Sequence, residues 1–290
     1  MVQQIIFVGL VNSATYFLLA LGFSLIFGVA RIINLSHTAL YMVSAYLVFS
    51  LIHFFGANTL LAIVFSVVAT ASLAALLYKF LIERIREHEL TVIIITVALA
   101  LILQECMAIA FGSHYRGVDT YVSGNVDVLG VSIANQHLII LAVATFCAGC
   151  VSLWLWKSRI GLAIRVTAQD REIANLMGIN VDAMCLIVTA VAGALAAVAG
   201  AMIAPLRAIE PRMWLSPLVI VMATVILGGL GSIKGSLLGA IILGFTETLV
   251  VFLIPLGGFL KGVAAMAIMI LVLLVRPEGL FGAVFEEERL

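Results

Sequence analysis

Long apolar runs dominate this chain, and short polar segments separate them. A run of roughly 20 apolar residues forms a helix long enough to cross a hydrocarbon core of about 30 Å. Six such spans are expected, over residues 5–29, 35–53, 59–82, 91–112, 137–156 and 183–205. Two shorter runs interrupted by glycine follow at 218–230 and 236–254, and a last span is expected at 261–275. The pattern predicts an all-α, polytopic bundle of about eight or nine transmembrane helices with broken or re-entrant segments.

Composition excludes a soluble fold. The 290 residues are 64% hydrophobic and 10% charged, and the mean hydropathy is +1.26, whereas soluble domains carry roughly 25% charged residues. Such a surface has to face lipid, so we expect an integral membrane protein embedded in the bilayer. A formal net charge of zero gives no support for a nucleic-acid partner. The polar stretches are too short for a soluble domain, so residues 1–290 are expected to form one membrane domain.

The cations are distributed unevenly between the two sides that alternating spans define. With the N-terminus outside, four cations fall on the outer side and eleven on the inner side. The outer four are Arg116, Arg207, Arg212 and Lys261. The inner eleven are Arg31, Lys79, Arg84, Arg86, Lys157, Arg159, Arg165, Arg171, Lys234, Arg276 and Arg289. Because cytoplasmic loops carry the excess of Lys and Arg, this predicts a periplasmic N-terminus and a cytoplasmic C-terminus. The first cation is Arg31, so the opening apolar run is interpreted as a resident span rather than a cleaved signal.

A charged loop at 157–182 carries an amphipathic pattern. Thr167 followed by Asp170 approximates a capping box, and Gly178 is typical of a helix stop. The helix expected between them places Ile173, Leu176 and Met177 on one face. Such a helix on the cytoplasmic side is suited to docking a partner protein. The alternative is a basic loop that lies on lipid headgroups.

Polar residues also interrupt the boundary between the first two spans. Asn34, Ser36 and His37 lie so close to apolar runs that they are expected at or within the membrane boundary. Irregular backbone at this depth is tolerated where it is buried in protein or lines a cavity, and broken helices form substrate sites in transporters. The alternative is a tight turn in which Asn34 and Ser36 cap the second helix.

Two carboxylates, Glu105 and Glu247, fall inside expected spans. An ionisable group in hydrocarbon costs about 3 kcal/mol, so each is expected to face a cavity or a partner group. Small residues at four-residue spacing in 190–204, including Gly193, Ala197 and Ala201, predict close helix packing. The glycine-rich stretch 228–236 fits neither nucleotide-binding template, because Ile233 precedes Lys234 where a P-loop requires glycine. It is interpreted as a helix break, and neither a metal site nor a catalytic constellation is expected.

Several motifs in order resemble those of a known family. They lie at 19–37, 161–172, 176–180, 227–236 and 273–280. Together they resemble the membrane subunit of branched-chain amino acid ABC transporters, the LivH-type permeases of bacterial uptake systems. The resemblance implies one ABC importer permease domain over 1–290, with loop 157–182 as its cytoplasmic coupling loop. The residues it implies in coupling to an ATPase are Arg165, Ala168, Asp170, Arg171, Glu172 and Gly178.

The resemblance also implies partners and a location. They are a second homologous permease, two cytoplasmic ATPase subunits that bind ATP and Mg, and a periplasmic substrate-binding protein, at the bacterial inner membrane. No cofactor and no catalysis are expected on this chain. The residues expected by the translocation path are Asn34, Ser36, His37, Glu105 and Glu247.

The cargo is left open by one departure from the family pattern. Family members usually continue the histidine with glycine and an acidic residue, whereas this chain has His37 followed by Thr38 and Ala39. Besides branched-chain and other small amino acids, urea or short amides are therefore candidate cargoes. A different class, an ion-coupled secondary transporter with Glu105 or Glu247 as its ion site, is the rival interpretation. An uptake assay with and without ATP separates the two.

Overall fold

The computed structural model describes residues 2–128 and 131–281. Within them, eight helices are long and apolar enough to cross a membrane. They are α1 (Val2–Ala30), α2 (His37–Phe55), α3 (Thr59–Leu77) with its π-helical continuation η1 (Tyr78–Ile82), α4 (Glu89–Phe111), α5 (Asn135–Lys157), α8 (Val181–Ile203), α10 (Ile233–Leu253) and α11 (Gly257–Val275). Shorter elements are α6 (Arg159–Gln169), α7 (Arg171–Leu176), α9 (Leu215–Gly228) and the antiparallel strands β1 (Asn125–Val128) and β2 (Val131–Ala134). The predicted helical bundle is confirmed.

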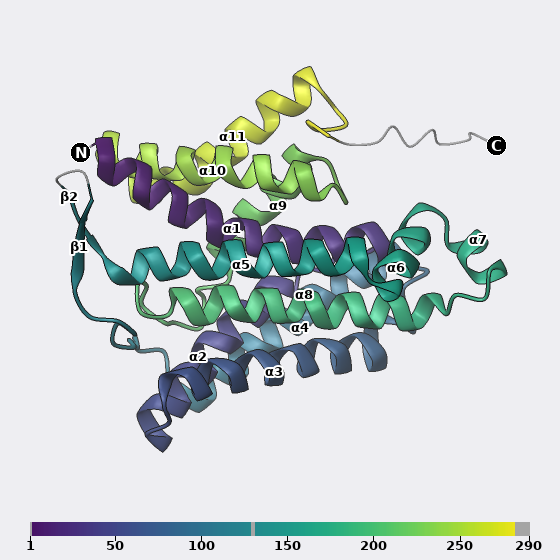
Figure 1. The fold of residues 1–290 in the computed structure, drawn as a ribbon, viewed down its shortest axis with the longest axis horizontal. Coiled ribbons are helices and arrows are strands. Elements are labelled where there is room, and N and C mark those ends of the chain that lie inside the picture. The colour runs from purple at the N-terminus through teal and green to yellow at the C-terminus, as the bar shows by residue number, and fades with distance from the viewer. Residues whose placement is uncertain (1, 129–130, 282–290) are drawn as a thin grey trace.

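The long helices run along one axis between two distinct ends of the molecule (Figure 1). The N-terminus and the β1–β2 hairpin lie at one end, called here the hairpin end. The short helices α6 and α7 lie at the opposite end, called here the α7 end. The hairpin occupies part of the polar stretch that the sequence pattern left as a loop.

The centre of the bundle is formed by α1 and α8. Most of the second half of α1 is buried, and α8 is largely buried by α1, α2 and α3. The outer helices α3, α4, α5 and α11 expose large apolar side chains instead, such as Phe65, Ile94, Phe146 and Leu274. This arrangement is the one expected where the outer solvent is lipid or another apolar surface.

Small residues allow α8 to sit at the centre. A Cβ on Gly193 would lie 2.4 Å from Cβ of Ala74 in α3, and a Cβ on Gly200 would lie 2.1 Å from the carbonyl oxygen of Tyr41 in α2. Neither position has room for a larger side chain. The close packing expected from the small-residue pattern is confirmed, and it places α2 and α3 directly against α8.

The bundle contains two interrupted regions, and the first joins α1 to α2. Nε2 of His37, the first residue of α2, donates to the carbonyl oxygen of Leu19 at 3.1 Å. Leu19 lies eleven residues before Ala30, the end of α1, which corresponds to about 16 Å along the helix. The backbone N–H of Leu35 donates to Thr96 in α4 at 3.3 Å. Residues 31–36 therefore run back into the bundle from the α7 end, and α2 begins near mid-depth.

The second interrupted region joins α8 to α9. The indole N–H of Trp214 donates to Oε1 of Gln104 at 2.9 Å, seven residues before the end of α4 at Phe111, or about 10 Å along it. Residues 204–214 therefore enter the bundle from the hairpin end. The α9 helix has 14 residues, about 21 Å of length, too short to cross the hydrocarbon core alone. The prediction of broken or re-entrant segments is confirmed at both places.

Candidate functional site

The α6–α7 segment at the α7 end is the first candidate site. Ser158 accepts from the N–H of Gly161 at 2.8 Å and starts α6, and Asp170 accepts from the N–H of Ile173 at 2.9 Å and starts α7. The predicted single helix after Thr167 is wrong, because Thr167 lies inside α6, buried, with its hydroxyl bonded to the carbonyl of Ala163. The predicted stop is confirmed, since Gly178 has a φ of +81°.

The α7 helix and the residue that follows it carry exposed apolar side chains. Ile173 is 52% exposed, Leu176 is 87% exposed and Met177 is 71% exposed. The pattern had placed these three on one face. The α7 helix itself lies beyond the ends of the long helices at the α7 end (Figure 1). A cluster of exposed apolar side chains at the polar end of a bundle is typical of a contact surface for another protein. Glu172 is also exposed beside them.

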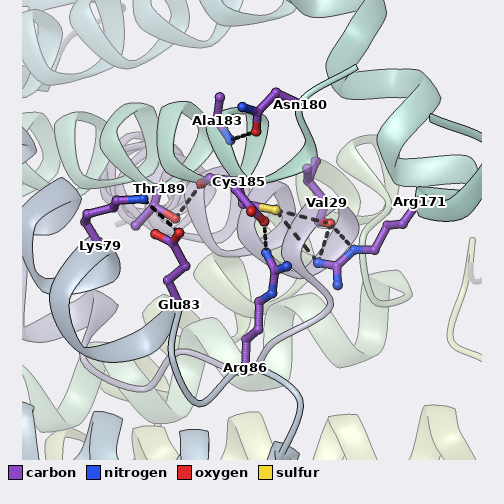
Figure 2. A network of polar contacts seen from close by, with 10 residues as sticks. Val29, Lys79, Glu83, Arg86, Arg171, Asn180, Ala183, Cys185 and Thr189 are labelled. Carbon is purple, nitrogen blue, oxygen red and sulfur yellow. Dashed lines mark hydrogen bonds and ion pairs between the residues drawn. The ribbon is translucent and has the colours of Figure 1, made fainter. Parts of the chain in front are cut away.

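The base of α7 is fixed to the core of the bundle by Arg171. Its Nε and Nη2 both donate to the carbonyl oxygen of Val29, at 3.1 and 2.9 Å, in the last turn of α1. Figure 2 shows the guanidinium reaching Val29 beside Cys185 of α8. The carbonyl of Val29 is among those that a helix C-terminus leaves without an internal partner. Arg171 therefore joins the start of α7 directly to the last turn of α1.

A second cation ties the loop after η1 to the same place. Arg86 forms an ion pair with Asp182 in the first turn of α8, close to Cys185 in Figure 2. Burial disfavours the charged guanidinium, but hydrogen bonds to Asp182 and Tyr78 outweigh it, so the pKa of Arg86 is raised above its ordinary value. The charge that holds this contact is present at every physiological pH. The last turn of α1, the first turn of α8, the loop after η1 and the start of α7 thus form one connected unit.

The remaining predicted coupling residues, Arg165 and Ala168, are partly buried in α6. The guanidinium carbon of Arg165 lies 4.9 Å from the ring centroid of Trp156 in α5, a cation–π contact. Ala168 lines a cavity of about 680 Å³ together with Arg31, Ile33 and Gly231. Arg165 and Ala168 therefore belong to the packing of α6, the helix that directly precedes α7.

The residues predicted near the translocation path, Asn34, Ser36 and His37, are all buried. Oδ1 of Asn34 accepts from the N–H of Ser36 at 3.1 Å and from its hydroxyl at 2.7 Å. Asn34 thus stabilises a tight turn that is buried in the bundle, but the side chain of Ser36 makes no capping hydrogen bond to α2. The predicted place of these residues by the translocation path stays a prediction. Nδ1 of His37 and the hydroxyl of Thr38 have no hydrogen-bond partner within residues 2–128 and 131–281.

The two predicted carboxylates lie in different surroundings. Glu105 is exposed on the outside of α4 and accepts from Nε2 of Gln104 at 3.1 Å. Glu247 is 4% exposed; its Oε2 accepts from the hydroxyl of Tyr16. Its Oε1 lies 3.3 Å from Nζ of Lys261 and 3.6 Å from Nη2 of Arg207. The two carboxylates have no partner in common among these contacts.

Arg207 and Lys261 were not singled out from the sequence. Arg207 follows α8 by four residues, and Lys261 lies in the first turns of α11. One signal was available: a carboxylate inside an apolar run requires a cation, and few cations fall at the hairpin end. That rule limits the expected partners of Glu247 to the cations at the hairpin end, but it does not select Arg207 and Lys261 among them.

The fold is similar to that of a solved structure titled "PsaBC from Streptococcus pneumoniae in complex with Fab". The TM-score is 0.51 at 15% identity, over 96% of this chain and 97% of that chain. This likeness concerns the fold, with its interrupted helices and the exposed segment at one end. A family model described as "Branched-chain amino acid transport system / permease component" matches residues 5–274. The chain belongs to this family.

Relatives of full length support the family assignment. The chain is 28% identical to the high-affinity branched-chain amino acid transport system permease protein BraD of Pseudomonas aeruginosa, over 94% of each sequence. It is 29% identical to the corresponding protein LivH of Escherichia coli, over 96% of this chain and 95% of that protein. The similarity therefore extends over the whole permease, from the first span to the last.

Proposed function

We propose that this permease imports branched-chain or other small amino acids into the bacterial cytoplasm. Its full-length relatives carry high-affinity branched-chain amino acid transport in their names. In the proposed complex, this single permease domain pairs with a second, homologous permease. Two ATPase subunits bind ATP and Mg on the cytoplasmic side, and a periplasmic binding protein delivers the solute. The N-terminus and hairpin end face the periplasm, and the α7 end faces the cytoplasm.

The observation that carries the coupling role is the form of the α6–α7 segment. It offers the exposed side chains of Ile173, Leu176 and Met177 outward, and it holds the last turn of α1 through Arg171. An ATPase docked on α7 would act on α1 through a pair of hydrogen bonds to one carbonyl oxygen. Rigid elements joined in this way carry a displacement between sites.

The proposed path for the solute passes the mid-depth start of α2. His37 and Thr38 have polar atoms there without partners among the described residues, and irregular backbone at this depth is typical of transporter sites. Closure of α1 against α2 would cover the path from one side. Glu105 is exposed on α4. It would take part in transport only if the solute path, or a protein contact, lies between the two permease subunits.

Replacement of one exposed side chain of α7 tests the coupling role. We expect Leu176→Asp to lower ATP-driven leucine uptake by tenfold or more, because a charged side chain would be buried in the ATPase contact. The measurement is uptake of radiolabelled leucine by vesicles that contain the complete complex, together with co-purification of the ATPases. Val122→Asp is the matched control, since Val122 is also an exposed apolar residue but lies beside the hairpin. Normal uptake and normal co-purification in Leu176→Asp would contradict the proposal.

A further inference from the structure

A charged cavity lies at the hairpin end, between the first half of α1, the end of α8, and α10 and α11. Its volume is about 370 Å³, within the range of small-molecule sites. Arg207, Glu247 and Lys261 line it, together with Asn12 and Thr248. The name Lys261 cavity is used for it below. It is separate from the α6–α7 segment, which occupies the other end of the molecule (Figure 1).

The charges on the wall of this cavity do not balance. Glu247 supplies one negative charge, and Arg207 and Lys261 supply two positive charges. Among the described residues that line the cavity, these are the charged ones apart from His137, which adds no negative charge. An excess positive charge at membrane depth is costly without an anion. The excess therefore favours an anionic group as the occupant.

The two cations are only loosely engaged by Glu247. The separations of 3.3 Å for Lys261 and 3.6 Å for Arg207 exceed the roughly 2.7–2.9 Å of tight charge-assisted hydrogen bonds. Nη2 of Arg207 also donates to Oδ1 of Asn12 at 3.4 Å. The amide of Asn12 is in turn fixed by donation to the hydroxyl of Thr248 at 3.2 Å. The cations are thus held in place at distances that leave donor capacity for a further acceptor.

Apolar side chains make up much of the rest of the wall. Val11 of α1, Ile203 at the end of α8, and Leu206 line the cavity together with the charged groups. A site that combines cations with aliphatic side chains matches a small molecule that carries an anionic group and a hydrocarbon body. Phosphate or sulfate would leave the apolar wall without contacts, which disfavours an inorganic anion.

We propose that the Lys261 cavity binds the carboxylate group of a small aliphatic substrate, with Lys261 and Arg207 as its direct contacts. Glu247, held by the hydroxyl of Tyr16, positions both cations and keeps the local charge low enough for the substrate to leave. The site would receive the solute on the side opposite the ATPase contact. This inference rests on the proposed function, because it assigns a subsite to the amino acid cargo.

Binding to the permease–ATPase complex in lipid nanodiscs, without binding protein and without ATP, tests the proposal. The probes are isovalerate, which has the carboxylate and branched chain alone, L-leucine, and leucinol, which lacks the carboxylate. Isothermal titration is expected to show binding of isovalerate and leucine but not of leucinol. Lys261→Met is expected to weaken isovalerate binding by tenfold or more, and Lys261→Arg is expected to retain it. Lys234→Met removes an exposed lysine of the α7 end and is the matched control.

Glu247→Gln separates a binding site from a purely structural ion cluster. Loss of one negative charge raises the local positive charge, so a carboxylate site is expected to bind isovalerate at least as tightly as the unchanged protein. A structural cluster would show a lowered melting temperature without binding in any variant. Equal affinity for leucine and leucinol, or unchanged isovalerate affinity in Lys261→Met, would overturn the inference. If the complete complex fails to take up leucine while isovalerate still binds, the proposed cargo is wrong and the subsite stands.

Discussion

Single glycines decide how closely the central helices approach each other. Gly200 is the sharpest case, because a Cβ there would lie 2.1 Å from the carbonyl oxygen of Tyr41. The added Cβ would be bonded to the backbone of α8, and the oxygen belongs to the backbone of α2. Neither atom can therefore move away without displacing a helix. The spacing of small residues in 190–204 was sufficient to predict this contact.

Gly200→Ala is expected to destabilise the protein by about 1–3 kcal/mol, the usual cost of forcing a methyl group into a packed interior. The measurement is the apparent melting temperature of the purified protein, which should fall by several degrees. Gly262→Ala is the control, since a Cβ at Gly262 meets nothing within 4 Å and alanine has the higher helix propensity. Equal melting temperatures for the two variants would show that α2 and α8 are not packed as described.

The contacts of Glu247 with Arg207 and Lys261 could not be predicted from the sequence. A carboxylate within an apolar span predicts a partner, but Arg207 lies on the far side of α9 in the chain and Lys261 lies in the next helix. No local spacing relates the three residues. Their meeting depends on how the end of α8 folds back over α1 and how α11 packs on α10, which is decided by tertiary packing.

At the scale of elements, hydropathy predicted the long helices well. Each expected span begins and ends within four residues of an observed helix, because lipid imposes one length and one composition on a crossing helix. Prediction failed in the loop 157–182, outside the hydrocarbon. The spacing of Thr167 and Asp170 suggested a cap at Thr167, yet burial of Ile164 and Thr167 extends α6 past that point. The cap falls at Asp170 instead.

Asp170 is therefore expected to be the residue that separates α6 from α7. Asp170→Ala removes the acceptor for the N–H of Ile173, a loss of about 1 kcal/mol, and the first turn of α7 should fray. Hydrogen exchange at Ile173 should become faster by about fivefold, and ATP-driven uptake should fall in the same variant. Asp170→Asn keeps a side-chain acceptor and should preserve both. Unchanged exchange in Asp170→Ala would mean that α7 is held by Arg171 alone.

At the scale of the whole molecule, the two ends differ in charge as the sequence predicted. The cations at the hairpin end are Arg116, Arg207, Arg212 and Lys261. The described cations at the α7 end are Arg31, Lys79, Arg84, Arg86, Lys157, Arg159, Arg165, Arg171, Lys234 and Arg276. This asymmetry favours retention of the α7 end in the cytoplasm.

The orientation can be tested with single cysteines in a variant whose four native cysteines are replaced by serine. Tyr115→Cys marks the hairpin end and Met177→Cys marks the α7 end; both positions are exposed. In intact cells expressing the permease without its partners, a membrane-impermeant maleimide is expected to label Cys at 115 after passing the outer membrane. It should reach position 177 only once the inner membrane is opened. The opposite pattern would place α7 outside the cell, where no ATPase could dock on it, and the Lys261 cavity would then open to the cytoplasm. One labelling experiment therefore tests the orientation on which both the coupling role and the direction of substrate entry depend.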